Sequence, residues 1–516
     1  MIILKNPILS GFYPDPSICR VDKDYYLVNS TFCYFPAIPI FHSRDLVHWE
    51  QIGNILNRNS QVDLSGCEHS GGIFAPTIRW HDGTFYLITT NMSHGGTFIV
   101  TAQSSFGPWS EPHFIAGTDG MDPSLFFDSD GRVFYVGTRP NSGGVRYFGD
   151  WEIWICEIDL QKMELVGEDT VIWRGALRGA AWPEGPHLYK HGLYYYLLSA
   201  EGGTEFFHAV VVARSECITG PYEGNPANPI LTHRHLGRNS TIVNVGHGDL
   251  IDTPDGAWFM VLLGSRPCEG YTNMGRETFL ASVEWQNEWP IVNPGHGRVE
   301  EIQTINMNGC PLPPQPCCDH FEGAYLNNQW MFLRNPTANL YSLSERKGFL
   351  RLFLKPQTLS DLDNPAFLGV RQRHQNYLVQ TKMEFTPHFD GETSGLAVVQ
   401  NNHYNIRFEK ALQNGRAVVQ IVQIINNEEK IIAQEPFSGD VLYLKIVEHR
   451  RIIRFFYGES EDTQQLMFDS LDSKMLSTEI AGGFVGCSIG LFATSNGKKS
   501  DGYSDFEWFE YIPADE

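Results

Sequence analysis

Three carboxylic acids stand at the start of similar short segments of this sequence: Asp15 in FYPDPSI, Asp122 in MDPSL and Glu184 in EGPHLYK. Carboxylates paired across one pocket indicate cleavage of a glycosidic bond, because the chain shows no HExxH zinc motif, phosphate loop or dinucleotide fingerprint. In that chemistry one acid protonates the leaving oxygen, and the other attacks the sugar or activates a water molecule. A third acid in contact raises the pKa of the first by like-charge repulsion or orients it through hydrogen bonds.

The sequence around each acid suggests how these roles are divided. Glu184 lies in AAWPEGPHLYK, between apolar and aromatic residues, where loss of solvent favours a protonated carboxyl group. Asp15 follows a tyrosine and a proline in a turn, which is compatible with an ionised carboxylate. These surroundings predict an acid at Glu184 and a base at Asp15.

A repeated unit must bring the acids together. Asp-Pro-Ser alone is ordinary turn chemistry, but each copy is followed by an apolar pair, a charged turn and a run of aromatic and β-branched residues, which predicts two strands joined by a tight hairpin. Five such units begin at residues 15, 75, 122, 184 and 247. Spacings of about 47 to 63 residues fit four-stranded blades and predict a five-bladed β-propeller. The first residues of the units should then meet at the central axis: Asp15, Ala75, Asp122, Glu184 and His247.

A second domain is expected after a proline-rich linker. The segment CPLPPQPCC at 310–318 holds four prolines in nine residues. From Asp319 the sequence consists of evenly spaced strand-like segments such as YLVQTKMEF and VLYLKIVEH, which predicts a β-sandwich of the concanavalin or lectin type. The expected organisation is all-β: a propeller over 1–305, a linker over 306–318 and a sandwich over 319–516.

Bulk properties exclude several classes of partner. A net charge of −22 argues against nucleic acid and anionic membranes as partners. The chain has no run of eighteen apolar residues and no signal-like start, so a cytoplasmic protein is expected, although a trimmed chain would read the same way. Its ten scattered cysteines favour reduced thiols over disulfides. The sequence does not indicate an oligomeric state.

Six motifs in order carry a resemblance to a known family: FYPDPSI, MDPSLFFD, EGPHLYK, AEGGT, GHGDL and GRETFL. Together they resemble glycoside hydrolase family 43, in the branch of β-xylosidases and α-L-arabinofuranosidases with a C-terminal β-sandwich that closes the pocket. The resemblance implies an inverting hydrolase with Asp15 as general base, Glu184 as general acid and Asp122 as the residue that tunes and positions Glu184. It implies no cofactor for the chemistry.

The resemblance also implies residues of the sugar pocket. Arg276 in GRETFL corresponds to an arginine that contacts the sugar and the acids, and Phe32 and His208 correspond to pocket walls. Phe484 corresponds to a sandwich residue that reaches the pocket, and Phe74 stands where relatives often have tryptophan, which changes the shape of the pocket. Core packing is the alternative reading for both Phe32 and Phe484.

Calcium is a structural candidate at three residues. By resemblance, His247 is a candidate ligand at the centre of the propeller, with a hydrogen-bonded core histidine as the alternative, because calcium prefers oxygen ligands. Asp319 and Asp505 resemble ligands of a structural calcium in related sandwich domains, and turn-capping carboxylates are the alternative there.

The expected activity is exo-acting release of terminal α-L-arabinofuranose and β-D-xylose from xylan- or arabinoxylan-derived oligosaccharides, with the arabinofuranoside preferred. One alternative is an endo-arabinanase, or a retaining fructan-cleaving propeller, whose WMNDPNG-like segment this chain lacks. Another is a carbohydrate-binding propeller without catalysis, which should have lost at least one of the three acids. The sequence does not decide how branched substrates are tolerated.

Overall fold

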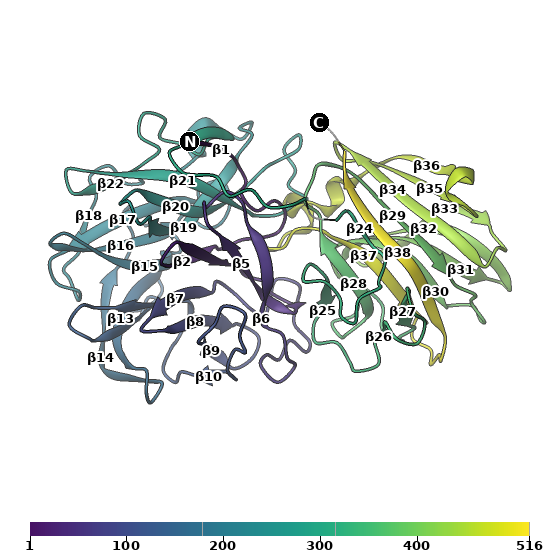
Figure 1. Ribbon diagram of the computed structural model, residues 1–516, viewed down its shortest axis with the longest axis horizontal. Helices are drawn as coiled ribbons and strands as arrows, with labels where there is room; N and C mark the ends of the chain where they lie inside the picture. The colour runs from purple at the N-terminus through teal and green to yellow at the C-terminus, as the bar shows by residue number, and fades with distance from the viewer. Residues whose placement is uncertain (178, 315, 515–516) are drawn as a thin grey trace.

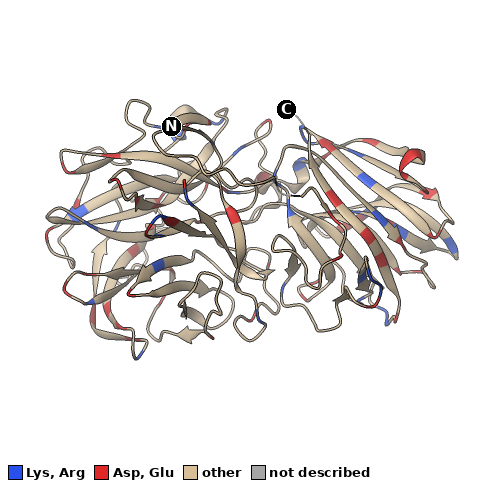
Figure 2. Ribbon diagram, in the orientation of Figure 1, with Lys and Arg blue, Asp and Glu red and all other residues tan. Residues whose placement is uncertain are grey.

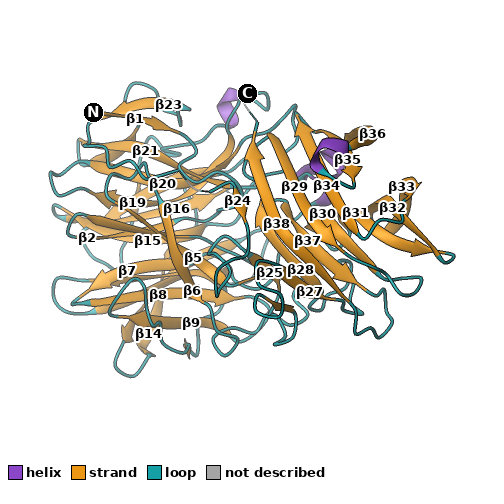
Figure 3. Cartoon of the chain, turned by 45° about the vertical axis from the view of Figure 1, so that its right-hand side comes forward, coloured by secondary structure: helices purple, strands orange, loops and turns teal. Residues whose placement is uncertain are grey.

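The computed structural model describes residues 1–177, 179–314 and 316–514 and consists of two β domains side by side (Figures 1 and 3). Residue 315 of the predicted linker and residues 515–516 of the predicted sandwich lie outside the described residues. Charged residues of both signs are interspersed along the sandwich strands (Figure 2). No helix in the described residues is long and apolar enough to cross a membrane.

The first domain is a propeller of five four-stranded sheets, which confirms the predicted fold. The first three blades are β2 (Ser17–Val21), β3 (Asp24–Val28), β5 (Ala37–Ser43) and β6 (Glu50–Leu56); β7 (Thr77–His81), β8 (Thr84–Asn91), β9 (Gly96–Ala102) and β10 (His113–Phe114); and β11 (Met121–Phe127), β12 (Val133–Pro140), β13 (Trp151–Asp159) and β14 (Glu164–Trp173). The last two blades are β15 (Glu184–His191), β16 (Tyr194–Glu201), β17 (Ala209–Ser215) and β18 (Glu223–Gly224); and β19 (Val243–Asp252), β20 (Trp258–Ser265), β21 (Glu277–Gln286) and β22 (Trp289–Val292). The ends of the domain pair with each other through β1 (Ile2–Lys5) and β23 (Ile302–Ile305).

The inner strands share an irregularity where the predicted acids lie. The ladder shifts register after Met121 in β11, after Glu184 in β15 and after Gly246 in β19. Asp15, Asp122 and His247 have positive φ angles of 52°, 51° and 43°. A β-bulge turns a side chain out of the regular alternation, and such backbone strain persists where the surrounding structure enforces it. The repeat therefore points these side chains toward the axis.

A buried ion pair ties the inner strands of four blades together. Arg79 of β7 donates to Asp249 of β19 at 2.8 Å, and Asp249 also accepts from Ser17 of β2 and from the hydroxyl of Tyr189 of β15. The second guanidinium nitrogen of Arg79 lies 2.9 Å from Nδ1 of His187. Removal of one partner from a buried pair costs about 3–5 kcal/mol, so this cluster holds the blades in register around the axis.

The second domain packs two sheets face to face and confirms the predicted sandwich. One sheet contains β26 (Tyr341–Ser342), β27 (Leu350–Phe353), β38 (Tyr503–Pro513), β29 (Asn376–Glu384), β34 (Val441–His449), β35 (Ile452–Gly458) and β36 (Gln465–Asp472), with β24 (Cys318–Asp319) beside β38. The other contains β33 (Glu428–Pro436), β32 (Arg416–Ile425), β31 (Tyr404–Gln413), β30 (Thr393–Asn401), β37 (Ser488–Thr494), β28 (Ala366–Arg371), β25 (Met331–Leu333) and β4 (Tyr34–Phe35). The helical segments are η1 (Arg234–Leu236), η2 (Glu461–Thr463), η3 (Ser473–Leu476) and α1 (Thr478–Ala481).

The two domains are joined by more than the linker. β4 comes from the propeller part of the chain, yet it pairs with β25 at the edge of the sandwich sheet. The buried Arg371 of β28 donates to the backbone oxygen of Phe12 at 2.6 Å. A single cluster of buried apolar side chains runs from Phe12 and Phe32 into the sandwich core. The sandwich is therefore fixed against the face that carries Asp15.

Candidate active site

A cavity of about 600 Å³ opens where the inner strands of the propeller begin, and it contains all three predicted acids. Phe484 of the sandwich lines it together with propeller side chains. The other lining residues named in the sequence analysis are Phe32, Phe74, His247 and Arg276. His208 is not among the lining residues but lies directly behind Glu184.

Asp15 is held as a carboxylate by charged and polar neighbours. Arg276 donates to its Oδ1 at 2.8 Å, and the hydroxyl of Ser30 donates to its Oδ2 at 2.6 Å. Burial acts to raise the pKa of Asp15, but the charges of Arg276 and His247 and the hydrogen bond from Ser30 outweigh it and lower the pKa below its usual value. Asp15 is therefore ionised at neutral pH and suited to act as a base.

Glu184 has the opposite electrostatic state. Its side chain is 13% exposed, and burial raises its pKa well above the usual range, with the charges of Asp122 and Asp15 acting in the same direction. Burial likewise raises the pKa of Asp122 to about 6. Two acids in one buried site do not ionise together, so a proton stays on Glu184 while Asp122 carries the negative charge.

Asp122 is oriented by the backbone beside Glu184. Its Oδ2 accepts a hydrogen bond from the amide of Gly185 at 3.1 Å. Because Gly185 follows Glu184 directly, this contact fixes Asp122 relative to the acid. Gly185 has a φ of 56°, and a Cβ atom there would lie 2.8 Å from the ring of His247. A larger residue at 185 would push the ring of His247 away from the inner strand β15.

His208 offers a hydrogen-bond acceptor next to Glu184. Its Nδ1 lies 3.0 Å from the carbonyl oxygen of Asn244, so that nitrogen carries the proton. Burial lowers the pKa of His208 to about 3, which keeps the ring neutral. Nε2 lies 3.9 Å from Oε1 of Glu184 and has no hydrogen-bond partner in the described residues. The buried lone pair of Nε2 therefore faces the carboxyl group of Glu184 from behind the cavity wall.

An aromatic corner contributed by both domains forms one wall of the cavity. Phe484 stacks on Phe32 with ring centroids 6.0 Å apart and meets Phe74 edge to face at 6.1 Å. The guanidinium of Arg276 lies 5.5 Å from the centroid of Phe484. Aromatic faces of this kind suit the C–H side of a sugar ring. Both Phe32 and Phe484 thus border the cavity, although Phe32 is also buried in the core.

The loop that carries Phe484 depends on glycines at the domain contact. Gly486 packs so closely on Met274 of the propeller that a Cβ atom would lie 2.4 Å from its carbonyl oxygen. The amide of Phe484 donates to the hydroxyl of Ser70 at 2.8 Å, and the carbonyl oxygen accepts from Arg276 at 3.4 Å. The position of the Phe484 ring is therefore set by the propeller as well as by the sandwich.

The calcium candidates have other partners in this structure. Asp319 accepts hydrogen bonds from the amide of Phe321 and from side chains of Asn327 and Trp330, as a turn-capping carboxylate does. Asp505 forms ion pairs with Arg346 and Arg351 through both oxygens.

Nδ1 of His247 lies 3.9 Å from Oδ1 of Asp15. The described part of the chain contains no group of three or more His, Cys, Asp or Glu side chains that could hold a metal ion. This donor set does not fit calcium, which prefers six to eight oxygens, and the calcium sites stay predictions from the resemblance.

Several cavity residues were not predicted from the sequence. The hydroxyl of Thr204 accepts a hydrogen bond from Arg276 at 3.0 Å, and Thr204 lies in the AEGGT motif that carries the resemblance. Trp182 precedes Glu184 by two residues and meets Phe148 edge to face, which its place in AAWPEG could have indicated. Met121 and Trp151 line the cavity from the first residues of β11 and β13, and the remaining lining residues come from loops with no repeat signal: Met92, Glu205, Phe206, Phe207 and Arg238.

Each of the two domains matches a known protein family. A family model described as glycosyl hydrolases family 43 matches residues 4–290. A second, described as the beta xylosidase C-terminal Concanavalin A-like domain, matches residues 318–512.

Full-length relatives are also found. A xylosidase/arabinosidase of Butyrivibrio fibrisolvens is 47% identical over 514 residues, covering 99% of each chain. A non-reducing end alpha-L-arabinofuranosidase of Bacteroides ovatus is 38% identical, covering 98% of this chain and 94% of the relative. The solved structure described as Bacteroides ovatus Xyloglucan PUL GH43B superposes with a TM-score of 0.93 at 36% identity, covering 99% of this chain and all of that chain.

Proposed function

The chain belongs to glycosyl hydrolase family 43, and on this premise we propose that it releases terminal α-L-arabinofuranose and β-D-xylose from xylan- or arabinoxylan-derived oligosaccharides with inversion of configuration. The observation that carries the proposal is that Asp15 and Glu184 line one cavity in surroundings that shift their pKa values in opposite directions: Arg276 and Ser30 hold the pKa of Asp15 low, and burial raises that of Glu184. This pairing supplies a base and an acid at the same pH.

In the proposed reaction, Asp15 removes a proton from a water molecule as that water attacks the anomeric carbon. Glu184 gives its proton to the glycosidic oxygen as the bond to the leaving sugar breaks. Inversion places water and leaving group on opposite faces of the sugar, which requires the two carboxyl groups to be about 6.5–9.5 Å apart. Asp122 does not touch the water but keeps Glu184 protonated and oriented through Gly185.

Exo action is favoured by the way the sandwich closes the cavity. The Phe484 loop packs on Phe32 and Phe74 at one side of the acids. These rings block the passage of a polysaccharide on that side, which favours the binding of a chain end next to the acids. An endo-arabinanase needs a cleft open on both sides. A carbohydrate-binding propeller without catalysis should have lost at least one of the three acids, but Asp15, Asp122 and Glu184 all line the cavity.

Dual specificity is supported by the relatives and by the cavity wall. The Butyrivibrio fibrisolvens relative is named a xylosidase/arabinosidase, and the Bacteroides ovatus relative is named an arabinofuranosidase. The aromatic corner formed by Phe32, Phe74 and Phe484 can pack against either pentose ring, because it offers apolar faces without hydrogen-bond donors.

Parallel assays test this proposal. We expect the enzyme to hydrolyse both p-nitrophenyl α-L-arabinofuranoside and p-nitrophenyl β-D-xyloside, with a higher kcat/KM for the arabinofuranoside. Proton NMR of the first-formed sugar should show the inverted anomer. A far higher rate on the xyloside would reverse the substrate order, and a retained anomer would exclude water activated by Asp15.

Arg276 should set the acidic limit of activity. Replacement of Arg276 by glutamine removes the charge that lowers the pKa of Asp15, so Asp15 becomes protonated at a higher pH. The acidic limb of the kcat/KM profile should move up by about one pH unit or more, which is the usual effect of one adjacent charge. Arg276→Lys should restore part of the shift.

The matched control is Arg238→Gln. Arg238 lines the same cavity, but its guanidinium lies over the ring of Phe206 at 4.4 Å. Its loss should leave the acidic limb in place. Equal shifts in both variants would mean that the overall charge of the cavity, and not the contact of Arg276 with Asp15, sets the pH of the acidic limb.

A further inference from the structure

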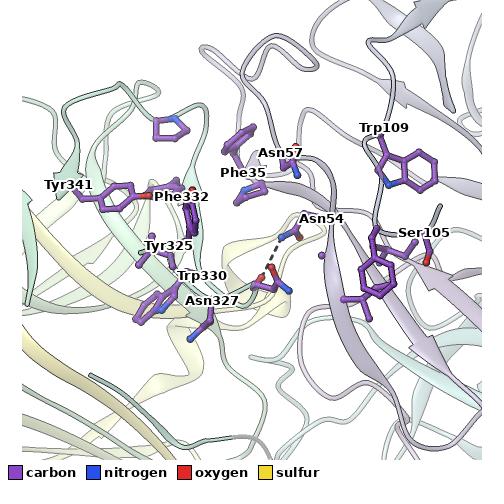
Figure 4. Close-up of a pocket in the computed structure, with 18 residues that line it drawn as sticks. Phe35, Asn54, Asn57, Ser105, Trp109, Tyr325, Asn327, Trp330, Phe332 and Tyr341 are labelled. Atoms are coloured by element: carbon purple, nitrogen blue, oxygen red, sulfur yellow. Dashed lines mark hydrogen bonds between the residues drawn. The ribbon is translucent and has the colours of Figure 1, made fainter. Parts of the chain in front are cut away.

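A second pocket lies at the junction of the two domains, away from the acids. It has a volume of about 590 Å³ and is bordered by the first two blades on one side and by the start of the sandwich on the other (Figure 4). Its lining shares no residue with the catalytic cavity. In Figure 4 the aromatic rings of Tyr325, Phe332 and Tyr341 stand on the sandwich side and face Phe35 and Asn57 of the propeller.

The lining of this junction pocket is uncharged. None of its 18 residues is Asp, Glu, Lys, Arg or His, whereas 19% of the whole chain is Asp, Glu, Lys or Arg. An ionic ligand would leave its charge unpaired in such a site, which is costly. A ligand that fits this lining is therefore a neutral molecule.

Aromatic rings are presented to solvent at the mouth of the pocket. The side chain of Tyr325 is 89% exposed, and Phe106 from the second blade is 77% exposed. Exposed aromatic side chains around a hollow are typical of a binding site. Tyr341 adds a half-buried ring to the lining, whereas Trp109 borders it as a buried ring. These rings offer apolar faces on which sugar C–H groups can stack.

Amide groups supply the polar part of the lining. The side-chain amide of Asn57 has no hydrogen bond to another group in the described part of the chain. Asn328 donates to the backbone of Gln51 at 3.3 Å, which leaves its side-chain oxygen available. Asn54 accepts from Gln51 at 3.2 Å, and its nitrogen makes only a long contact of 3.5 Å. An amide both donates and accepts, and therefore matches the hydroxyl groups of a neutral sugar.

We propose that the junction pocket is a second carbohydrate site, which holds a neutral xylan-type oligosaccharide or polysaccharide segment while the catalytic cavity works on chain ends. The choice of xylan rests on the proposed function, whereas the class of ligand follows from the uncharged, aromatic and amide-rich lining. Binding here raises the concentration of chain ends near the enzyme, as a tethered second site does.

Affinity electrophoresis of the full-length chain in soluble arabinoxylan measures binding and tests the proposal. The Asp15→Ala background prevents hydrolysis during the measurement, and saturating xylose competes for the catalytic cavity. We expect Tyr325→Ala with Phe106→Ala to raise the dissociation constant for arabinoxylan about tenfold, since two stacking contacts are lost. In the background with Asp15 intact, the same pair should leave kcat/KM on p-nitrophenyl arabinofuranoside within twofold.

Phe114→Ala is the matched control, because Phe114 is an aromatic residue of the same blade, 52% exposed and outside the lining. It should bind arabinoxylan as the parent does. Unchanged affinity in the double variant, or an equal loss with Phe114→Ala, would overturn the proposal. A change in the oligomeric mass of the double variant, measured by light scattering, would also overturn the proposal, since it would show that the pocket is a contact between protein chains. Failure of the parent enzyme on both p-nitrophenyl pentosides would instead count against the proposed function.

Discussion

Replacement of Asp15 by alanine should abolish turnover of every substrate, whatever its leaving group. Arg276 and Ser30 hold the Asp15 carboxylate in place, whereas the ionised Asp122 is held by the amide of Gly185 beside Glu184. The variant therefore has no carboxylate at the position that takes the proton from water. A general base contributes up to about 10⁴-fold to a rate, and we expect a fall of that size in kcat/KM. Azide ions, which attack without a base, should restore part of the release of p-nitrophenol and give a glycosyl azide.

Two further variants make the Asp15 result decisive. Asp15→Asn keeps the volume and a hydrogen-bond acceptor for Arg276, so it should fold normally and still be inactive. Asp24→Ala removes a carboxylate that pairs with Arg44 on the first blade outside the cavity, and it should stay within twofold of the parent. Retention of more than a tenth of the rate in Asp15→Ala would refute the role of Asp15 as base.

Loss of the proton donor should have an effect that depends on the substrate. In Glu184→Ala, kcat/KM for xylobiose or an arabino-oligosaccharide should fall about 10³- to 10⁴-fold, because a sugar cannot leave unprotonated. A dinitrophenyl pentoside needs no such help and should lose less than about tenfold. Burial and the charge of Asp122 raise the pKa of Glu184, so the parent loses activity as rising pH deprotonates it. The basic limb of the pH profile should disappear in the variant.

Glu205→Ala is the matched control for the acid. Glu205 is an exposed carboxylate that lines the same cavity, but it lacks the burial that keeps a proton on Glu184. It should change neither the leaving-group dependence nor the basic limb. If Glu184→Ala slowed dinitrophenyl and oligosaccharide substrates equally, Glu184 would not be the proton donor.

The propeller could be predicted from the sequence because its signals are local. Each blade begins with a turn and an alternating hairpin, such as PSLFFDSDGRVFYVGT after Asp122, and five copies in register are enough to define a ring. The same repeat explains why Asp15, Asp122 and Glu184 line one cavity. Their protonation could be anticipated only in outline, since the pKa of Asp15 depends on Arg276, 261 residues away in the chain.

The remaining parts of the site depend on contacts that no local pattern encodes. Phe484 borders the cavity because its loop packs on Met274 and Ser70 of the other domain. The ion pair of Arg79 with Asp249 joins the second and fifth blades, and neither residue stands at the first position of its repeat unit. Trp182 could have been predicted as a pocket residue, because it lies two residues before Glu184.

The short strand β4 bears on how this architecture can be altered. It is part of the propeller segment by sequence but completes the outer edge of a sandwich sheet by pairing with β25. A sandwich cut at the proline-rich linker would lose that neighbour and present bare amide and carbonyl groups, which invite sheet extension and aggregation. The appended domain is thus no interchangeable module, and chimeric enzymes built from this scaffold would need to carry Tyr34 and Phe35 with it.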